Sequence, residues 1–395
     1  MLPATPAGSA AADPRDVALL AALADYRLLH ARMLSAKTSP LERHIVKCEP
    51  SAQMGNRVRF VASCLLLAMV SDRALVVSFK DGYYAGLDEL FENPGFAWEM
   101  GVAAEGAGGL ATQGSRSLDP KAFESFVCAD LGAPMGGTLS VAGNFFFLPF
   151  VAANPLYRDR VRAWFPDGNV FGGMARTVFR PAAEVRELMD GFLLDAGRKA
   201  GLPEGEPWRC DLGFQIRNDN DPVNSPQVSG KEWELYRKCA ADLLPRGKRD
   251  KPAVFVATDS EASREICTKE VPYPFEVFGN FQRSNNPDGV RRALVDLLVF
   301  STCDVMLVSP WSSYGRVASV YAGRQAYFVT DWVMPIGEPH RKFVDVLKHE
   351  DGRSGCFKFL RTEPCPWHGP RGDLGFNDVI RKTSCWDASM FSDVC

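Results

Sequence analysis

The sequence has no apolar run long enough to cross a bilayer. Its longest such run, residues 58–70, is interrupted by Arg59 and is shorter than the ~20 residues that a spanning helix needs. An excess of basic residues is also missing, because 45 lysines and arginines are balanced by 48 aspartates and glutamates. No extended positive field is available to neutralise a phosphate backbone. We therefore expect neither a spanning helix nor a nucleic-acid partner.

Signs of secretion are missing from the sequence as well. Residues 1–13 are rich in Ala and Pro but contain no Lys or Arg ahead of an apolar stretch, unlike a secretory signal peptide. No Asn-x-Ser/Thr acceptor occurs, so glycosylation gives no support for secretion. Either a targeting segment is missing from this sequence or the protein is soluble where it works.

Cysteine, by contrast, is abundant. The chain has 11, an odd number that excludes complete internal pairing, although several disulfides would suit an oxidising lumen. Cys356, Cys365, His368 and Cys385 could be drawn as a zinc site, but their spacing lacks a second close pair. We expect disulfides or free thiols there rather than a metal, with the connectivity open.

The 395 residues are too many for one ordinary core, which favours two domains. After an opening helix at residues 17–33, the first half contains a βαβ unit. The second half alternates between strand and helix periods, which is typical of parallel sheets with helices on both faces. The βαβ unit spans residues 44–79, and the later strands are expected at 212–217, 254–258, 275–277, 305–308 and 326–330.

Composition changes mark the borders of these regions. A helix between Pro181 and Gly201 closes the first half, so we predict domains at 1–202 and 203–395, the second with a Cys/Pro-rich tail. Residues 101–120 are rich in Gly, Ala and Ser and are predicted to form a surface loop. The aromatic run at 145–148 is predicted to be a buried strand, with the lining of a binding groove as the alternative.

The most informative segment is 304–322, where a buried strand ends in a serine-rich turn and an apolar helix follows. In a parallel sheet such a turn lies at the carboxyl edge, where the free N–H groups of the helix face a ligand. The segment predicts an anion site at residues 309–315. An ordinary crossover capped by serine is the alternative.

Polar residues follow two more of the predicted strands. Arg217 ends an apolar strand, and its guanidinium could bind a diphosphate through two parallel hydrogen bonds; pairing with Asp219 or Asp221 is the alternative. Asp259 ends the next strand and could bind a nucleoside or cap a helix.

A third group of polar residues, Gly55-Asn56-Arg57, opens the first buried helix. It could supply ligand donors or merely a turn and a cap.

With these residues in view, the chain resembles the plant-type, xyloglucan-class GDP-fucose fucosyltransferase family. The segment 212–217 is similar to the family's "VGVQIR", and 303–318 to its "SDVLVTSAWSTFGYVA". The resemblance covers most of the chain, and its other matching segments are 26–32, 54–57, 71–77, 154–171 and 363–368.

This resemblance implies a GT-B architecture, in which two Rossmann-like domains face each other across a cleft. The N-terminal domain is then the acceptor side, and the C-terminal domain holds GDP-fucose without a metal or a further cofactor. Arg217 would contact the β-phosphate and Asp259 the guanine side. The other donor-binding residues would be Trp311, Ser312, Ser313, Tyr314 and Gly315 around the diphosphate and ribose, with Gly55, Asn56 and Arg57 reaching in from the other domain.

The resemblance also implies an inverting transfer of L-fucose. We expect an α-1,2 link on a galactose-containing cell-wall glycan, with a glycoprotein or arabinose-bearing acceptor, or a catalytically silent binding protein, as alternatives. Arg217 would stabilise the leaving GDP. The candidate general bases are Asp219, Asp221 and Asp88, and their spacing in the sequence does not select one of them. A loose transition state that needs no base is the alternative.

Three departures from the family pattern stand out. Gln53 replaces its first glycine, Asn220 stands where it has an aspartate, and the membrane anchor that most members carry is not seen in this sequence. The family's compartment would be the Golgi lumen. The oligomeric state is open, and a dimer is compatible with the sequence.

Overall fold

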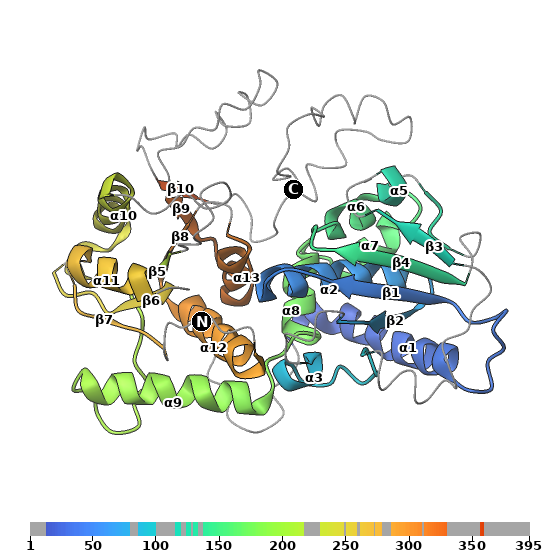
Figure 1. Cartoon of the computed structure of the whole chain (residues 1–395), viewed down its shortest axis with the longest axis horizontal. Coiled ribbons are helices and arrows are strands. Elements are labelled where there is room, and N and C mark those ends of the chain that lie inside the picture. The colour runs from blue at the N-terminus through green and yellow to red at the C-terminus, as the bar shows by residue number, and fades with distance from the viewer. Residues whose placement is uncertain are drawn as a thin grey trace, which may run out of the picture. The chain divides into compact units, whose positions relative to one another are not determined.

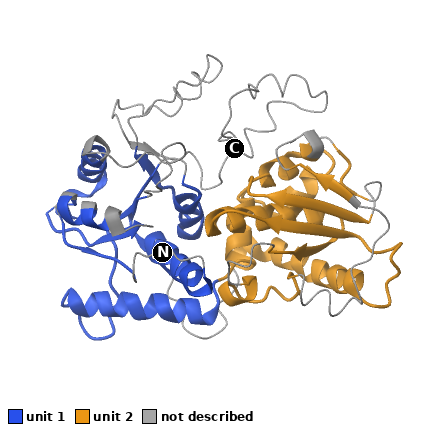
Figure 2. Cartoon of the chain, in the orientation of Figure 1, with its two compact units in different colours: residues 1–4, 181–362 blue, residues 5–180, 363–395 orange. Residues whose placement is uncertain are grey.

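The computed structural model describes residues 13–79, 86–99, 115–119, 124–127, 129–132, 137–216, 230–248, 250–258, 261–271, 273–278, 286–309, 312–329 and 356–358. The chain divides into two compact units (Figure 2). We call residues 5–180 with 363–395 the N-terminal unit, and residues 1–4 with 181–362 the C-terminal unit.

The N-terminal unit is built on a parallel sheet of strand order β2-β1-β4-β3. Its strands are β1 (Ile45–Pro50), β2 (Ala74–Val77), β3 (Ser115–Leu118) and β4 (Thr138–Gly143). The predicted βαβ unit is confirmed, since β1 and β2 are parallel neighbours joined by α2 (Met54–Val70). Around them lie η1 (Pro14–Asp16), α1 (Val17–Leu34), α3 (Leu87–Leu90), α5 (Glu124–Val127), α6 (Leu148–Ala153), α7 (Arg158–Trp164) and α8 (Val170–Thr177) (Figure 1).

Helix α2 is apolar around nearly its whole circumference, and from Phe60 to Val70 each residue is buried. A helix of this kind must be covered on all sides. It packs on β1 and β2 with one side and on α6 and α8 with others. No helix among the described residues has the length and apolarity that a bilayer crossing requires.

The outer edge of β2 is closed by side chains of α1. The N–H of Leu75 donates to the hydroxyl of Tyr26 at 2.9 Å, and the carbonyl of Leu75 accepts from Nε2 of His30 at 2.9 Å. Burial lowers the pKa of His30, so the ring is neutral with its proton on Nε2. Two residues one helical turn apart thus satisfy both outward groups of one edge residue.

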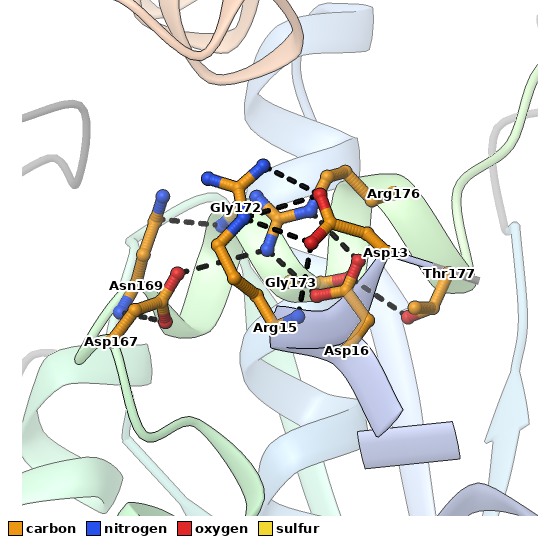
Figure 3. Close-up of polar contacts among 9 residues, drawn as sticks. All are labelled: Asp13, Arg15, Asp16, Asp167, Asn169, Gly172, Gly173, Arg176 and Thr177. Atoms are coloured by element: carbon orange, nitrogen blue, oxygen red, sulfur yellow. Dashed lines mark hydrogen bonds and ion pairs between the residues drawn. The ribbon is translucent and has the colours of Figure 1, made fainter. Parts of the chain in front are cut away.

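A buried ion pair anchors the start of α1 to α8. Asp16 accepts two hydrogen bonds from Arg176, at 2.8 Å from Nε and 2.7 Å from Nη2, and its side chain is 4% exposed (Figure 3). Beside it, Asp13 and Arg15 form a second pair that is much more exposed. Asn169 caps α8 by accepting from the N–H of Gly172 at 3.0 Å. The pair of Asp16 and Arg176 joins segments 160 positions apart in the chain.

The C-terminal unit holds a sheet of strand order β10-β9-β8-β5-β6-β7 in which only the β10–β9 pair is antiparallel. The strands are β5 (Leu212–Ile216), β6 (Val254–Thr258), β7 (Phe275–Glu276), β8 (Val305–Val308), β9 (Tyr327–Val329) and β10 (Cys356–Lys358). The helices are α9 (Ala183–Lys199), α10 (Gly230–Leu243), α11 (Glu261–Glu270), α12 (Pro287–Thr302) and α13 (Ser313–Ala322), with a short 3₁₀ turn, η3 (Arg246–Lys248).

The central strand β5 has two different faces. Phe214 packs on Trp233 and Tyr236 of α10, at ring-centroid distances of 6.3 and 5.8 Å. On the opposite face Gly213 leaves room for Phe300, which a Cβ at this position would meet at 2.6 Å. The α12 layer can therefore approach the sheet closely only because position 213 has no side chain.

A disulfide between Cys210 and Cys303 joins the segments that lead into β5 and β8. The two cysteines are 93 positions apart in the chain, so the bridge closes a long loop. The prediction that the chain holds disulfides is confirmed at this pair. The cysteines at 365, 385 and 395 lie outside the described residues.

Helix α9 belongs with the C-terminal unit by its packing. It lies against α12, and Phe192 contacts Phe255 of β6 at 5.8 Å. The units divide between Arg180 and Pro181, whereas the predicted boundary at 202 places this helix in the first domain. Its own buried face explains the difference, since a helix joins the sheet that covers its apolar stripe.

Two local predictions in the N-terminal unit were wrong. Residues 145–147 are not a strand but a turn before α6, in which Phe146 and Phe147 are nonetheless buried. Strand β3 lies within the segment predicted as a loop, residues 101–120. Most of the aromatic run is buried as expected, but it is an irregular segment whose rings pack on aromatic side chains of other elements, such as Phe147 on Phe126 of α5 at 4.6 Å.

Candidate functional site

The two strand ends that carry the candidate anion site are direct neighbours. β5 and β8 pair in parallel, with Gln215 opposite Val308. The N–H of Ser309, the first residue past β8, donates to the carbonyl of Gln215 at 3.0 Å. The turn before α13 and the segment after β5 therefore leave the sheet at the same carboxyl edge, as the sequence predicts.

Hydrogen bonds between two hydroxyl groups and a carbonyl fix the backbone where the chain leaves β8. The hydroxyl of Tyr236 lies 3.2 Å from the carbonyl of Gln215 and 3.2 Å from Oγ of Ser309. Ser309 is 4% exposed. Because these groups are buried and hydrogen-bonded to one another, the start of the turn is held in one position.

Ser312 is the N-cap of α13. Its backbone is extended, and its Oγ accepts from the N–H of Gly315 at 3.4 Å. The helix ends at Gly323, which has a φ of 61° and supplies the left-handed C-cap. α13 thus begins at the sheet edge, three residues earlier than the sequence predicts, and directs the positive end of its dipole there.

Gly315, in the first turn of α13, packs tightly against β8. A Cβ built at this position would lie 2.6 Å from Cγ1 of Val308 and 2.8 Å from its Cβ. No flexible end is available to move away, because Val308 is fully buried in the sheet. The absent side chain at 315 therefore sets how closely the helix N-terminus approaches the strand.

We expect Gly315→Ala to destabilise the protein by about 1–3 kcal/mol through overpacking. The companion substitution Val308→Ala removes the contacting methyl groups, so the double variant should recover part of this loss relative to the sum of the single variants. Urea unfolding of the four proteins in the cycle measures the coupling. Strict additivity would show that the contact between positions 315 and 308 does not limit the packing.

Tyr314, predicted to wrap the nucleotide, directs its hydroxyl at α12 instead. This hydroxyl lies 3.0 Å from Oδ2 of Asp296 and 3.1 Å from the carbonyl of Ala293. Burial raises the pKa of Asp296 to about 8, with the Tyr314 hydrogen bond acting in the opposite direction. The described contacts therefore give Tyr314 the role of fastening the first turn of α13 to its neighbour.

The raised pKa of Asp296 predicts a pH-dependent stability. Between the ordinary pKa of 3.8 and about 8, the folded protein keeps a proton that the unfolded chain has lost, so stability falls as pH rises. Asp296→Asn keeps an oxygen for Tyr314 and removes the titration. Between pH 6 and pH 7 we expect the difference in free energy of unfolding, variant minus wild type, to increase by up to about 1.4 kcal/mol. Equal pH slopes for the two proteins in urea unfolding would contradict the assignment.

Gln215 is a candidate ligand-binding residue that the sequence analysis missed. Its side chain is 5% exposed, and no described group hydrogen-bonds to its Oε1. This oxygen lies 3.4 Å from the position that a Cβ of Gly315 would occupy, so it faces the first turn of α13. A polar residue at an inward position of the otherwise apolar strand 212–216 is the sequence signal that could have found it.

In the N-terminal unit, the predicted tripeptide occupies the first turn of α2. The N–H groups of Asn56 and Arg57 donate to the carbonyl of Gln53 at 3.0 and 3.1 Å. The loop before them includes Ala52, whose φ of 66° is unusual for a residue with a side chain. Gly55 is buried, and Asn56 is partly exposed.

The guanidinium of Arg57 is turned back into its own unit. Its Nε donates to the carbonyl of Ala52 at 2.7 Å, and its Cζ lies 5.3 Å from the ring centroid of Phe79. These contacts stabilise the loop between β1 and α2. A direct contact of Arg57 with a ligand stays a prediction.

Several predicted site residues lie outside the described residues: Arg217, Asp219, Asp221, Asp259 and Trp311. Ser313, which is described, is buried in the first turn of α13. Asp88, a candidate base, accepts from Nε1 of Trp98 at 2.8 Å. Among the residues that the structure describes, no group of three His, Cys, Asp or Glu side chains could hold a metal.

A scan against family models finds no match. The chain is 22% identical over 262 residues to "Putative fucosyltransferase 10" of Arabidopsis thaliana, an alignment covering 60% of this chain. It spans about half the length of that relative, 47%.

Solved structures show the fold. A mutant of Arabidopsis thaliana FUT1 in complex with GDP matches with a TM-score of 0.56 and 19% identity, covering 87% of this chain and 83% of that one. In sequence and in fold, the chain is thus similar to plant fucosyltransferases. The NodZ α-1,6-fucosyltransferase of Bradyrhizobium, soaked with GDP-fucose, matches with a TM-score of 0.50 and 13% identity over 72% of this chain and 94% of that one. The predicted GT-B fold is thereby confirmed, and so is the resemblance to the plant-type family.

Proposed function

We propose that the protein is a fucosyltransferase that uses GDP-fucose as its donor. The observation that carries the proposal is the serine-capped N-terminus of α13 beside the end of β5, in a fold shared with a GDP-bound fucosyltransferase. A helix N-terminus at the carboxyl edge of a parallel sheet suits the diphosphate of such a donor.

The chemistry of the transfer explains what this edge would do. As the bond from the anomeric carbon to the phosphate oxygen breaks, negative charge grows on the departing GDP. Donors that are already in place around the phosphate stabilise this state more than the bound substrate. We assign this role to Arg217 and to the turn that leads into α13, with Asp259 on the guanine side.

Four residues hold the two ends of the turn in place. Tyr236 and Ser309 fix its start, Ser312 caps the helix, and Tyr314 fastens the first turn to α12. Preorganisation of this kind costs no rearrangement when charge develops. No metal or cofactor besides the donor is part of the proposal.

For the finer reaction we propose inversion at the anomeric carbon and an α-1,2 link to a galactose-containing, cell-wall-type glycan. The support is the resemblance of the motifs at 212–217 and 303–318 to the xyloglucan class. A glycoprotein or arabinose-bearing acceptor is the second candidate. Asp219 and Asp221 are the proposed bases, if the acceptor hydroxyl needs one.

We also propose the Golgi lumen as the place of action. The disulfide between Cys210 and Cys303 supports it, because such bonds persist in an oxidising compartment.

The test is a titration with GDP followed by a turnover assay with GDP-fucose, with and without an array of glycan acceptors. We expect GDP to bind and fucose to reach a glycan. GDP binding with neither hydrolysis nor transfer would favour a silent binding protein, and no binding of GDP would refute the nucleotide site. The stereochemistry and linkage of the product test the finer proposal.

A further inference from the structure

Arg59 lies in the second turn of α2 and carries a charge without a counter-charge. Among the described residues, no hydrogen bond or ion pair involves its guanidinium, and its Nε is buried without a partner. Its Cζ lies 4.8 Å from the ring centroid of Phe146. The contact that the structure gives this cation is therefore an aromatic face.

Other buried arginines of the same unit are satisfied differently. Arg43 donates to the carbonyls of Met33 and Ser35, and Arg73 donates to the carbonyls of Gly137 and Gly132. Those guanidinium groups stabilise loops by bonding to backbone oxygens. Arg59 has no such bond, so the same structural explanation does not apply to it.

An unpaired guanidinium in this position is costly. Burial lowers the pKa of Arg59 to about 10, with no neighbouring anion acting in the opposite direction. The side chain is partly buried, and the buried unpartnered nitrogen is Nε, so the two Nη groups still reach solvent. Apart from the ring of Phe146, the described structure gives this guanidinium no partner.

The surroundings of Arg59 can hold a ligand. Phe146 is 3% exposed and is itself fixed against Phe171 at 5.5 Å, so the ring below the guanidinium cannot move easily. Asn56 precedes Arg59 by three residues, which places both on adjacent positions of one helix face. Phe145, the residue before Phe146, is partly exposed. Apolar surface with a few polar groups is typical of a small-molecule site.

We propose that Arg59 binds a carboxylate of the glycan acceptor, and hence that the preferred acceptor carries an acidic sugar. The inference rests on the proposed function and concerns the N-terminal unit, the acceptor side. A guanidinium lying over a ring keeps its donor edge free, and a carboxylate matches that edge through two parallel bonds. The two ligand oxygens would supply the anion that the protein does not.

The test compares binding of trigalacturonate and the neutral β-1,4-galactotriose by calorimetry, in the wild type, Arg59→Gln and Arg32→Gln. Arg32 is exposed on α1, so its variant controls for the loss of one positive charge. We expect the Kd for trigalacturonate to rise at least tenfold in Arg59→Gln only, with galactotriose and GDP unaffected. Arg59→Lys should bind trigalacturonate with an intermediate Kd, because it keeps the charge but not the fork.

Three results would overturn the inference. They are wild-type protein that does not bind trigalacturonate, an unchanged Kd in Arg59→Gln, or a tenfold weaker affinity for GDP with trigalacturonate unaffected, which would make a nucleotide phosphate the anion. A Tm of Arg59→Gln at or above that of the wild type is also expected, and a large drop would indicate a structural role. GDP binding by the wild type separates these outcomes from failure of the nucleotide site itself.

Discussion

Arg217→Ala is expected to lower the turnover of GDP-fucose by ~10²–10³, the usual loss when one preorganised donor to a developing negative charge is removed. The residue follows β5, whose end lies beside the turn into α13. Since the charge on the departing GDP exists mainly in the transition state, the loss should appear in kcat more than in KM. Steady-state kinetics with a saturating acceptor measures both constants.

Two further variants sharpen this experiment. Arg217→Lys keeps the charge but cannot make two parallel bonds, so its rate should lie between those of the wild type and Arg217→Ala. Arg209→Ala removes an exposed arginine just before β5 and should leave the rate unchanged. A wild-type rate in Arg217→Ala would refute the assigned role.

Arg176→Ala is expected to destabilise the protein by about 3–5 kcal/mol, because it leaves the buried carboxylate of Asp16 without its partner. Asp16 receives two hydrogen bonds from Arg176, and its side chain is 4% exposed (Figure 3).

The neighbouring pair supplies a matched control. Arg15 pairs with Asp13, but the side chains are 57% and 32% exposed, so Arg15→Ala should cost less than about 1 kcal/mol. The double variant Asp16→Asn/Arg176→Ala removes both charges and should be more stable than Arg176→Ala. Urea unfolding at pH 7 tests all three. Equal losses for Arg176→Ala and Arg15→Ala would mean that burial of the Asp16–Arg176 pair does not decide its contribution.

Much of the architecture could be predicted from periodicity. In α12, Val290, Leu294, Leu297 and Leu298 mark one buried face, and Pro287 after the capping Asn286 marks its start. The strands β5 and β8 were predictable as short apolar runs that each end in polar residues. These features depend on local patterns, which is why the sequence reveals them.

The orientation of individual side chains was beyond the sequence. Tyr314 sits in a motif that suggested a ligand, yet its hydroxyl is bonded to α12. Arg57 is bonded to the loop before its own helix. Neither partner could be identified without the packing of elements far apart in the chain. The prediction of a strand at 145–148 was wrong because an aromatic run indicates burial but not backbone geometry.

The attachment of α1 to β2 also bears on how copies of the protein can associate. At Leu75 both outward backbone groups of the edge strand β2 are hydrogen-bonded, and the N–H of Val77 donates to the carbonyl of Trp98. A neighbouring chain therefore finds no template there for growing a continuous intermolecular β-structure. By occupying this edge, Tyr26 and His30 disfavour aggregation through edge-to-edge strand pairing. Both residues lie in the segment 26–32, which resembles the plant-type family.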